Sequence, residues 1–168
     1  ADIIETYKDI ATQKAANKAV IVYESVWKHT QQIAESLAEG FSDADMDVKV
    51  YQLSDTKSSI VMREIMDAKV VCIGSGTYNN VMAPSVAAFL EHIRPCKFKN
   101  KKGLAFAAYG WFNQVAKEID TRMQQSGIES CHDVINQCYT PSDDQLEDYF
   151  NVAKEIAKNA RNKISWHF

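Results

Sequence analysis

Short apolar runs alternate with amphipathic stretches along this chain from Lys18 onward. The apolar runs have the length and composition of buried strands, and they predict strands at 18–23, 47–53, 69–74, 102–110 and 134–139. The amphipathic stretches repeat their apolar residues every three or four positions. They predict helices at 30–41, 58–68, 84–93 and 113–127, with a last helix from Ser142 onward.

Local signals mark the ends of several of these helices. Pro84 opens one of them, where its missing N–H removes no intrahelical bond. Gly40 and Gly127 are interpreted as stop signals. Ser142 and Gln145 have the spacing of a capping box. The predicted inward stripe of the last helix is Leu146, Phe150, Ala153, Ala157, Ala160 and Ile164.

The alternation of strands and helices predicts an α/β fold, a doubly wound parallel sheet of five strands with helices on both faces. Alternating Val48 and Val50 predict an edge or half-exposed position for the second strand. Residues 1–17 are polar and alanine-rich, and are predicted to be a leader or interdomain linker before a domain of residues 18–168. In such sheets ligands bind beyond the carboxyl ends of the strands, where strand order reverses. The turns after the first, third and fourth strands are therefore the candidate site.

The turn after the first strand combines hydroxyl groups with the start of a helix. The first amides of a helix lack intrahelical partners and attract anions, phosphate above all. An ordinary N-cap at Thr30, with Ser25 in a plain turn, is the alternative. The glycine motifs of ATP-binding and NAD-binding loops are absent. The candidate phosphate-binding residues are Ser25, Val26, Trp27, Lys28, His29 and Thr30.

The other two turns combine small residues with aromatic ones. Small residues let a flat ligand approach the backbone, and stacked aromatic side chains favour a flat ring. A phosphate site beside an aromatic cleft predicts a mononucleotide with a large planar ring, which is FMN. The candidate residues are Ser75, Gly76, Thr77, Tyr78, Asn79 and Asn80 in the first of these turns, and Ala108, Tyr109, Gly110, Trp111, Phe112 and Asn113 in the second.

Composition narrows the class of protein. The formal charge of -3, with no basic block, argues against a nucleic-acid binder. No run approaches the roughly 18 apolar residues of a membrane span. No clustered set of metal ligands and no hydrolase triad stands out, so neither a metal site nor catalytic residues are predicted. The four cysteines are scattered, which is typical of a reducing cytoplasm, and Cys72 is predicted to lie in the core.

From about Lys18 to Trp166 the chain resembles the flavodoxin fold, and more narrowly the flavodoxin-like domain of flavodiiron proteins, also called A-type flavoproteins. The residues that carry this resemblance are "VIVYESVWKHT", "VCIGSGTYNNVMAPSVAAFL" and "FAAYGW". The resemblance implies strand order 2-1-3-4-5 and FMN bound by 25–30 at the phosphate, with 77–80 and 109–111 at the ring. It also implies that "DIIETYKDIA" joins a metal domain to the flavin domain.

The same resemblance implies an electron-transfer role. Electrons would come from a rubredoxin-like or flavin reductase donor and pass to a diiron domain or protein that is not in this chain. The oligomeric state, including a homo-oligomer, stays open. The chain departs from the family at Lys28, Gly76 and Phe112, where a small residue, a proline and small residues or glycines are usual. Two alternatives are an NAD(P)H-dependent flavin or quinone reductase and a flavin-free interaction domain.

Overall fold

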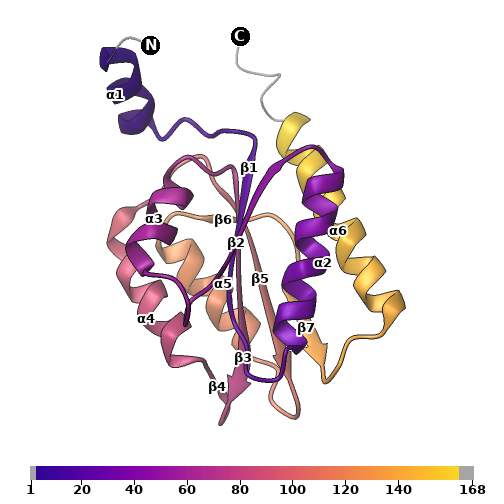
Figure 1. Ribbon diagram of the computed structural model, residues 1–168. Helices are drawn as coiled ribbons and strands as arrows, with labels where there is room; N and C mark the ends of the chain where they lie inside the picture. Colours follow the sequence, from indigo (N-terminus) through magenta and orange to yellow (C-terminus); the bar gives the residue numbers. More distant parts are fainter. Residues whose placement is uncertain (1–2, 163–168) are drawn as a thin grey trace.

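A computed structural model describes residues 3–162 and shows one central sheet with helices on both faces (Figure 1). The strands are β1 (Lys18–Glu24), β2 (Asp47–Gln52), β3 (Val70–Tyr78), β4 (Val81–Met82), β5 (Lys102–Tyr109), β6 (Glu129–Ser130) and β7 (Ile135–Cys138). The helices are α1 (Ile3–Thr12), α2 (His29–Asp43), α3 (Ser58–Met66), α4 (Pro84–Ile93), α5 (Val115–Gln125) and α6 (Asp143–Asn162), with the 3-10 turn η1 (Arg94–Cys96).

The strand order confirms the doubly wound topology. The strands run β2-β1-β3-β5, and both β6 and β7 pair with β5 in parallel. The expected order 2-1-3-4-5 is therefore present, with β2 at the edge, but the fifth strand is split into two short pieces. The sequence did not predict β4, which pairs antiparallel with the end of β3. Asn79 and Asn80 both have positive φ (46° and 67°), as a two-residue type I′ hairpin requires.

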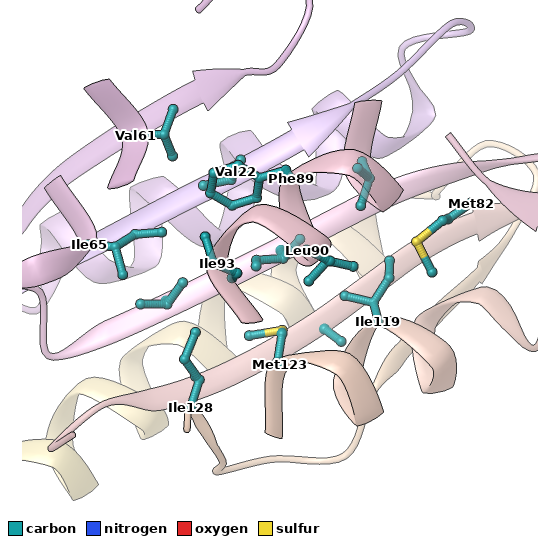
Figure 2. Close-up of a cluster of buried hydrophobic side chains, with 14 of the residues drawn as sticks. Val22, Val61, Ile65, Met82, Phe89, Leu90, Ile93, Ile119, Met123 and Ile128 are labelled. Carbon is teal, nitrogen blue, oxygen red and sulfur yellow. The ribbon is translucent and has the colours of Figure 1, made fainter. Parts of the chain in front are cut away.

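Two apolar layers hold the helices on the sheet. Helices α3, α4 and α5 cover one face, and α2 and α6 cover the other (Figure 1). Successive side chains of β1 point to opposite faces, so Val22 joins the first layer and Ile21 the second. Figure 2 shows the first layer, where Phe89 and Ile119 come from different helices. Cys72 lies in the second layer, fully buried as predicted.

Helix α6 confirms its predicted capping box. The Gln145 N–H donates to Ser142 Oγ (3.3 Å), and the Ser142 N–H donates to Gln145 Oε1 (3.0 Å). The predicted stripe is buried at three alanines and half-buried at Leu146 and Phe150, while Ile164 lies outside the described residues. Ile156 is also buried, although it was not predicted. The buried alanines are Ala153, Ala157 and Ala160.

The interpretation of Gly40 as a stop signal is wrong. Helix α2 continues to Asp43, and Gly40 lies inside it. A Cβ atom at Gly40 would lie 2.3 Å from the carbonyl oxygen of Phe150. Gly40 therefore permits close contact between α2 and α6, and this contact fixes α2 on the sheet.

The amino ends of the strands contain buried lysines. Lys18 Nζ lies 2.7 Å from carboxylate oxygens of both Glu64 and Asp67. Lys101 is 2% exposed, and its Nζ donates to the carbonyl oxygens of Met66 (2.8 Å) and Ala68 (3.0 Å). These lysines neutralise carboxylates and satisfy carbonyls at the end of α3, so this end of the sheet is closed by paired groups.

The segment before β1 contains α1, on which Ile3, Ile4 and Tyr7 are exposed. The Ala16 N–H donates to the carbonyl oxygen of Asp67 (2.7 Å), which attaches the segment to the domain. The role of residues 1–17 as a leader or linker stays a prediction.

Candidate functional site

A cavity of about 350 Å³ opens at the carboxyl ends of β1, β3 and β5. All three predicted turns contribute to its wall, because the carboxyl ends of parallel strands meet at one edge of the sheet. A fourth contribution comes from Tyr139, which follows β7. The lining residues are Ser25, Val26, Trp27, His29, Thr30, Gly76, Thr77, Tyr78, Ala108, Tyr109, Gly110, Trp111 and Tyr139.

The first turn leads into α2 without a side-chain cap. Lys28 is the N-cap residue in a left-handed conformation (φ 64°), and its side chain makes no capping hydrogen bond. The helix then begins at His29, so Thr30 is its second residue and is buried. The alternative that Thr30 is an ordinary N-cap is therefore wrong. The turn combines an uncapped helix start with the lining residues Ser25 and Thr30, which is an arrangement suited to an anion.

Aromatic side chains from separate turns stand at the mouth of the cavity. Trp27 is 80% exposed and Trp111 is 83% exposed, although both line the cavity. The Trp111 indole N–H donates to Asn80 Oδ1 (3.0 Å), so the second and third turns are joined. Exposed indoles at a cavity are suited to cover a flat ligand, since their apolar faces contact water unless a ligand stacks on them.

The turn after β3 contains a polar group without a partner. Thr77 lines the cavity, and its Oγ1 is buried with no hydrogen-bond partner among residues 3–162. Buried hydroxyl groups nearly always have a partner, and one left unpaired calls for an explanation such as a ligand. The Ser75 hydroxyl, in contrast, has a partner. Its Oγ accepts a hydrogen bond from the Ala83 N–H (2.8 Å), which holds the turn against the start of α4.

Several predicted site residues do not line the cavity. Asn79 and Asn80 form the β3–β4 hairpin turn. Phe112 is half-buried and packs against the first apolar layer. Lys28 and Asn113 are exposed. Contacts of all these residues with a cofactor stay predictions.

His29 joins the first turn to the loop before α6. Its Nε2 lies 3.0 Å from Thr140 Oγ1. Tyr139, next to Thr140, is 62% exposed, and its N–H donates to the carbonyl oxygen of Tyr109 (2.8 Å). The sequence analysis missed Tyr139 as a site residue, although it is the last residue of the fifth predicted strand and the same rule on carboxyl ends applies to it.

Glu24, the last residue of β1, is a second residue that the sequence analysis did not select. It is 9% exposed and accepts hydrogen bonds from several donors around the first turn. Burial raises the pKa of the Tyr78 phenol, and the negative charge of Glu24 raises this pKa further. No short-range pattern distinguishes this carboxylate, since three of its four donors come from distant parts of the chain.

The described part of the chain offers neither a metal site nor a membrane span. Within residues 3–162 no three His, Cys, Asp or Glu side chains lie close enough to hold a metal ion. No helix in the same range is long and apolar enough to span a bilayer. All four cysteines are free thiols.

Comparison with known proteins gives consistent matches. The family model described as Flavodoxin matches residues 21–152. A nitric oxide reductase of Moorella thermoacetica is 38% identical over 127 residues, which are 76% of this chain and 32% of that protein. The structure of rubredoxin oxygen:oxidoreductase from the anaerobe Desulfovibrio gigas has a TM-score of 0.92 and 32% identity, covering 96% of this chain and 40% of that one.

A flavodoxin from the domain Archaea has a TM-score of 0.77 and 25% identity, and covers 86% of this chain and 99% of the flavodoxin. The chain therefore spans at most two fifths of the length of the two reductases, but it spans nearly all of a free-standing flavodoxin.

Proposed function

We propose, from the premise that this chain belongs to the flavodoxin family, that it binds FMN in the cavity at the carboxyl ends of β1, β3 and β5 and acts as an electron-transfer domain. The observation that carries this proposal is the cavity itself, where an uncapped helix start and exposed aromatic residues meet. Membership in the flavodoxin family supports a flavin as the ligand of this cavity, and FMN is the flavin that we propose.

The first turn would hold the phosphate. The amides at the start of α2 have no side-chain partner, and the positive end of the helix favours a negative group there. Ser25 and Thr30 line the cavity and add hydroxyl groups. Together these donors suit a phosphate ester without a metal ion.

The second and third turns would hold the ring. Trp27 and Trp111 provide exposed aromatic faces, and Thr77 provides a hydroxyl group that the protein itself does not satisfy. Bound FMN would supply the electron transfer, while the chain orients it and limits the access of water. The bond from Trp111 to Asn80 fixes one side of the mouth before any ligand arrives.

We propose further that the electrons come from a protein donor, either rubredoxin-like or a flavin reductase, and pass to a diiron centre outside residues 18–168. The support is similarity to a rubredoxin oxygen:oxidoreductase and to a nitric oxide reductase, each of which is much longer than this chain. Residues 1–17 would then link this domain to another. Mixing the FMN-loaded chain with reduced rubredoxin or with NAD(P)H tests this proposal. Rapid bleaching by NAD(P)H alone would favour the reductase alternative.

Titration of the purified chain with FMN tests the cofactor proposal. We expect saturable quenching of flavin fluorescence and the visible absorption bands of a bound flavin. A chain that remains colourless after FMN is added and the excess is removed would contradict the proposal and favour a flavin-free interaction domain.

The substitution Thr30→Val tests the assignment of the phosphate loop. We expect FMN binding to weaken by about 1–3 kcal/mol, because a phosphate oxygen loses its hydroxyl donor. Thr121→Val is the matched control, since the exposed Thr121 hydroxyl only donates to the carbonyl oxygen of Lys117 within α5. An unchanged dissociation constant for Thr30→Val would exclude this role of the first turn.

A further inference from the structure

Glu24 ends β1 immediately before the turn that would hold the phosphate. We propose that Glu24 is a positioning residue of this site. Its carboxylate fixes the first turn and places an uncompensated negative charge behind the cavity, which lowers the reduction potential of bound FMN. This inference rests on the proposed function, but part of it is testable without the cofactor.

The Glu24 carboxylate joins three separate parts of the chain to the first turn. Its Oε1 accepts from the Ser25 N–H (3.1 Å), from Gln52 Nε2 (2.9 Å) and from Ser54 Oγ (3.4 Å). Its Oε2 accepts from Ser85 Oγ (3.2 Å). The end of β2, the turn after β2 and the first turn of α4 are therefore all anchored on one side chain.

The charge of this carboxylate is solvated by the protein but not cancelled. Its four donors are a backbone amide, a side-chain amide and two hydroxyl groups, and all of them are neutral. Donors of this kind replace the water that a buried carboxylate loses, but they bring no positive charge to it. Lys18, at the other end of β1, shows the opposite case, in which charge is matched by charge.

The influence of Glu24 extends to two walls of the cavity. Ser25 lines the cavity, and its N–H donates to Glu24. Tyr78 lies on the wall that β3 contributes. After burial, the charge of Glu24 is the second cause that raises the pKa of Tyr78. The carboxylate therefore acts on one wall through a hydrogen bond and on another through its field.

A fixed negative charge near a flavin opposes reduction, because reduction adds negative charge to the flavin. The interaction between two like charges is strong where water is excluded and weak where water intervenes. Burial of Glu24 at 9% exposure keeps water from screening it on the protein side. The sign of the effect is therefore a lower reduction potential than the same cavity would give with a neutral residue.

Glu24→Gln separates the charge from the shape. The Gln side chain has the same size, its oxygen still accepts hydrogen bonds, and its amide can donate to the Ser85 hydroxyl. We expect the midpoint potential of bound FMN to rise in a redox titration. In the FMN-free chain we expect the pKa of Tyr78 to fall, because the charge of Glu24 is removed while the effect of burial remains. Titration of ¹³C-labelled tyrosine by NMR, assigned with Tyr78→Phe, measures the second effect.

Glu64→Gln is the matched control. Glu64 is also a mostly covered carboxylate (19% exposed), and its loss changes the net charge by the same amount. It lies beside Lys18, at the other end of β1, which places it roughly 20 Å from Glu24 along the strand. We expect neither the potential nor the Tyr78 titration to change.

Glu24→Asp keeps the charge but shortens the side chain. We expect FMN to bind more weakly, because the anchor on the first turn is displaced, while the potential stays close to that of the wild type. A Glu24→Gln protein with wild-type values of both the potential and the Tyr78 pKa would overturn the inference. If the wild-type chain binds no FMN, the proposed function fails, and the Tyr78 titration alone still decides whether the charge of Glu24 acts on the cavity.

Discussion

The amino and carboxyl ends of the same sheet differ in how their polar groups are satisfied. At the amino ends, Lys18 pairs with two carboxylates and Lys101 donates to two carbonyls. At the carboxyl ends, the Thr77 hydroxyl is buried without a partner in the described part of the chain, and the start of α2 has no side-chain cap. One end is complete without a ligand, whereas the other has groups that a ligand would satisfy.

Left-handed backbone conformations occur in non-glycine residues at both ends of the sheet, including Asp45 before β2 and Asn100 before β5 at the amino end. Gly127, in the turn between α5 and β6 at the amino end, has φ +93° in tight packing. At the carboxyl end, left-handed conformations occur at Lys28, Asn79, Asn80 and Tyr139, none of which is glycine. Such conformations cost free energy in non-glycine residues and are concentrated at functional sites. Because such conformations occur at both ends, the polar groups left without a partner, and not the backbone, distinguish the carboxyl end from the amino end.

The largest expected effect on stability comes from replacing a glycine at the amino end by alanine. In Gly127→Ala the new Cβ atom would lie 2.3 Å from the Phe98 carbonyl oxygen. Together with the positive φ, this overlap should reduce the free energy of unfolding by roughly 3 kcal/mol. Urea denaturation of the FMN-free chain measures it.

Gly110→Ala is the matched change at the carboxyl end. Its Cβ atom would lie 3.5 Å from the Tyr139 ring, which is an ordinary contact. We expect the free energy of unfolding to change by less than about 0.5 kcal/mol. The affinity for FMN should change, because Gly110 lines the cavity. Equal losses of stability in the two variants would contradict the comparison.

The next effect concerns Lys101 and pH. Burial lowers the pKa of Lys101 from 10.5 to about 8, the charge of Asp67 opposes this shift, and Lys18 adds to it. Between these pH values the unfolded chain binds more protons than the folded one, so stability rises with pH. The free energy of unfolding should rise by about 2 kcal/mol between pH 7.5 and pH 10.

Lys101→Met is the control, because its side chain does not titrate. The difference in unfolding free energy between wild type and this variant cancels the titration of other groups, including Lys69 and Cys72, whose pKa values are lowered and raised respectively by burial. A difference that stays constant from pH 7.5 to 10 would show that Lys101 keeps its ordinary pKa in the folded protein.

A smaller effect should follow from Thr77→Val. This change removes a buried hydroxyl group that has no partner in the described range, so the FMN-free chain should become more stable by about 0.5–1 kcal/mol. FMN affinity should fall by a similar amount, about 1 kcal/mol, since a hydroxyl contact is lost. Thermal unfolding with and without FMN measures both quantities. A loss of stability in the FMN-free chain would mean that Thr77 already has a partner.

The smallest expected effect is that of Lys28→Gly. Glycine adopts the observed φ of 64° without steric cost, and the fold should gain about 0.5 kcal/mol. Lys97→Gly makes the same change near the amino ends (φ 46°), but it removes the bond from Nζ to the Gln125 carbonyl oxygen (2.8 Å). We therefore expect less gain there. A loss of stability in Lys28→Gly would exclude strain at the first turn.

Much of the fold was predictable, because periodicity is a local property. The helix at 84–93 has the predicted bounds, and the capping box of α6 forms as expected. Gly40 was misinterpreted because its partner Phe150 lies far away in the sequence, and only packing brings α2 and α6 together.

The candidate site was predictable only at the level of its turns. Parallel strands bring their carboxyl ends together by necessity, so three of the turns were found. The packing of Phe112 against the core, the hairpin at Asn79 and Asn80, and the hydrogen bonds of Glu24 all depend on neighbours that no short stretch specifies. Tertiary contacts, not local patterns, decide which residues of a turn line the cavity.

The positions of Trp27 and Trp111 have a practical consequence. Two of the three tryptophans of this protein stand at one cavity mouth, and they are 80% and 83% exposed to solvent. Indole emission is sensitive to its surroundings, and a bound aromatic ligand that absorbs at the wavelengths of this emission would quench it. The native protein thus has an optical reporter at its entrance, and a stopped-flow instrument can follow guest arrival without any attached dye.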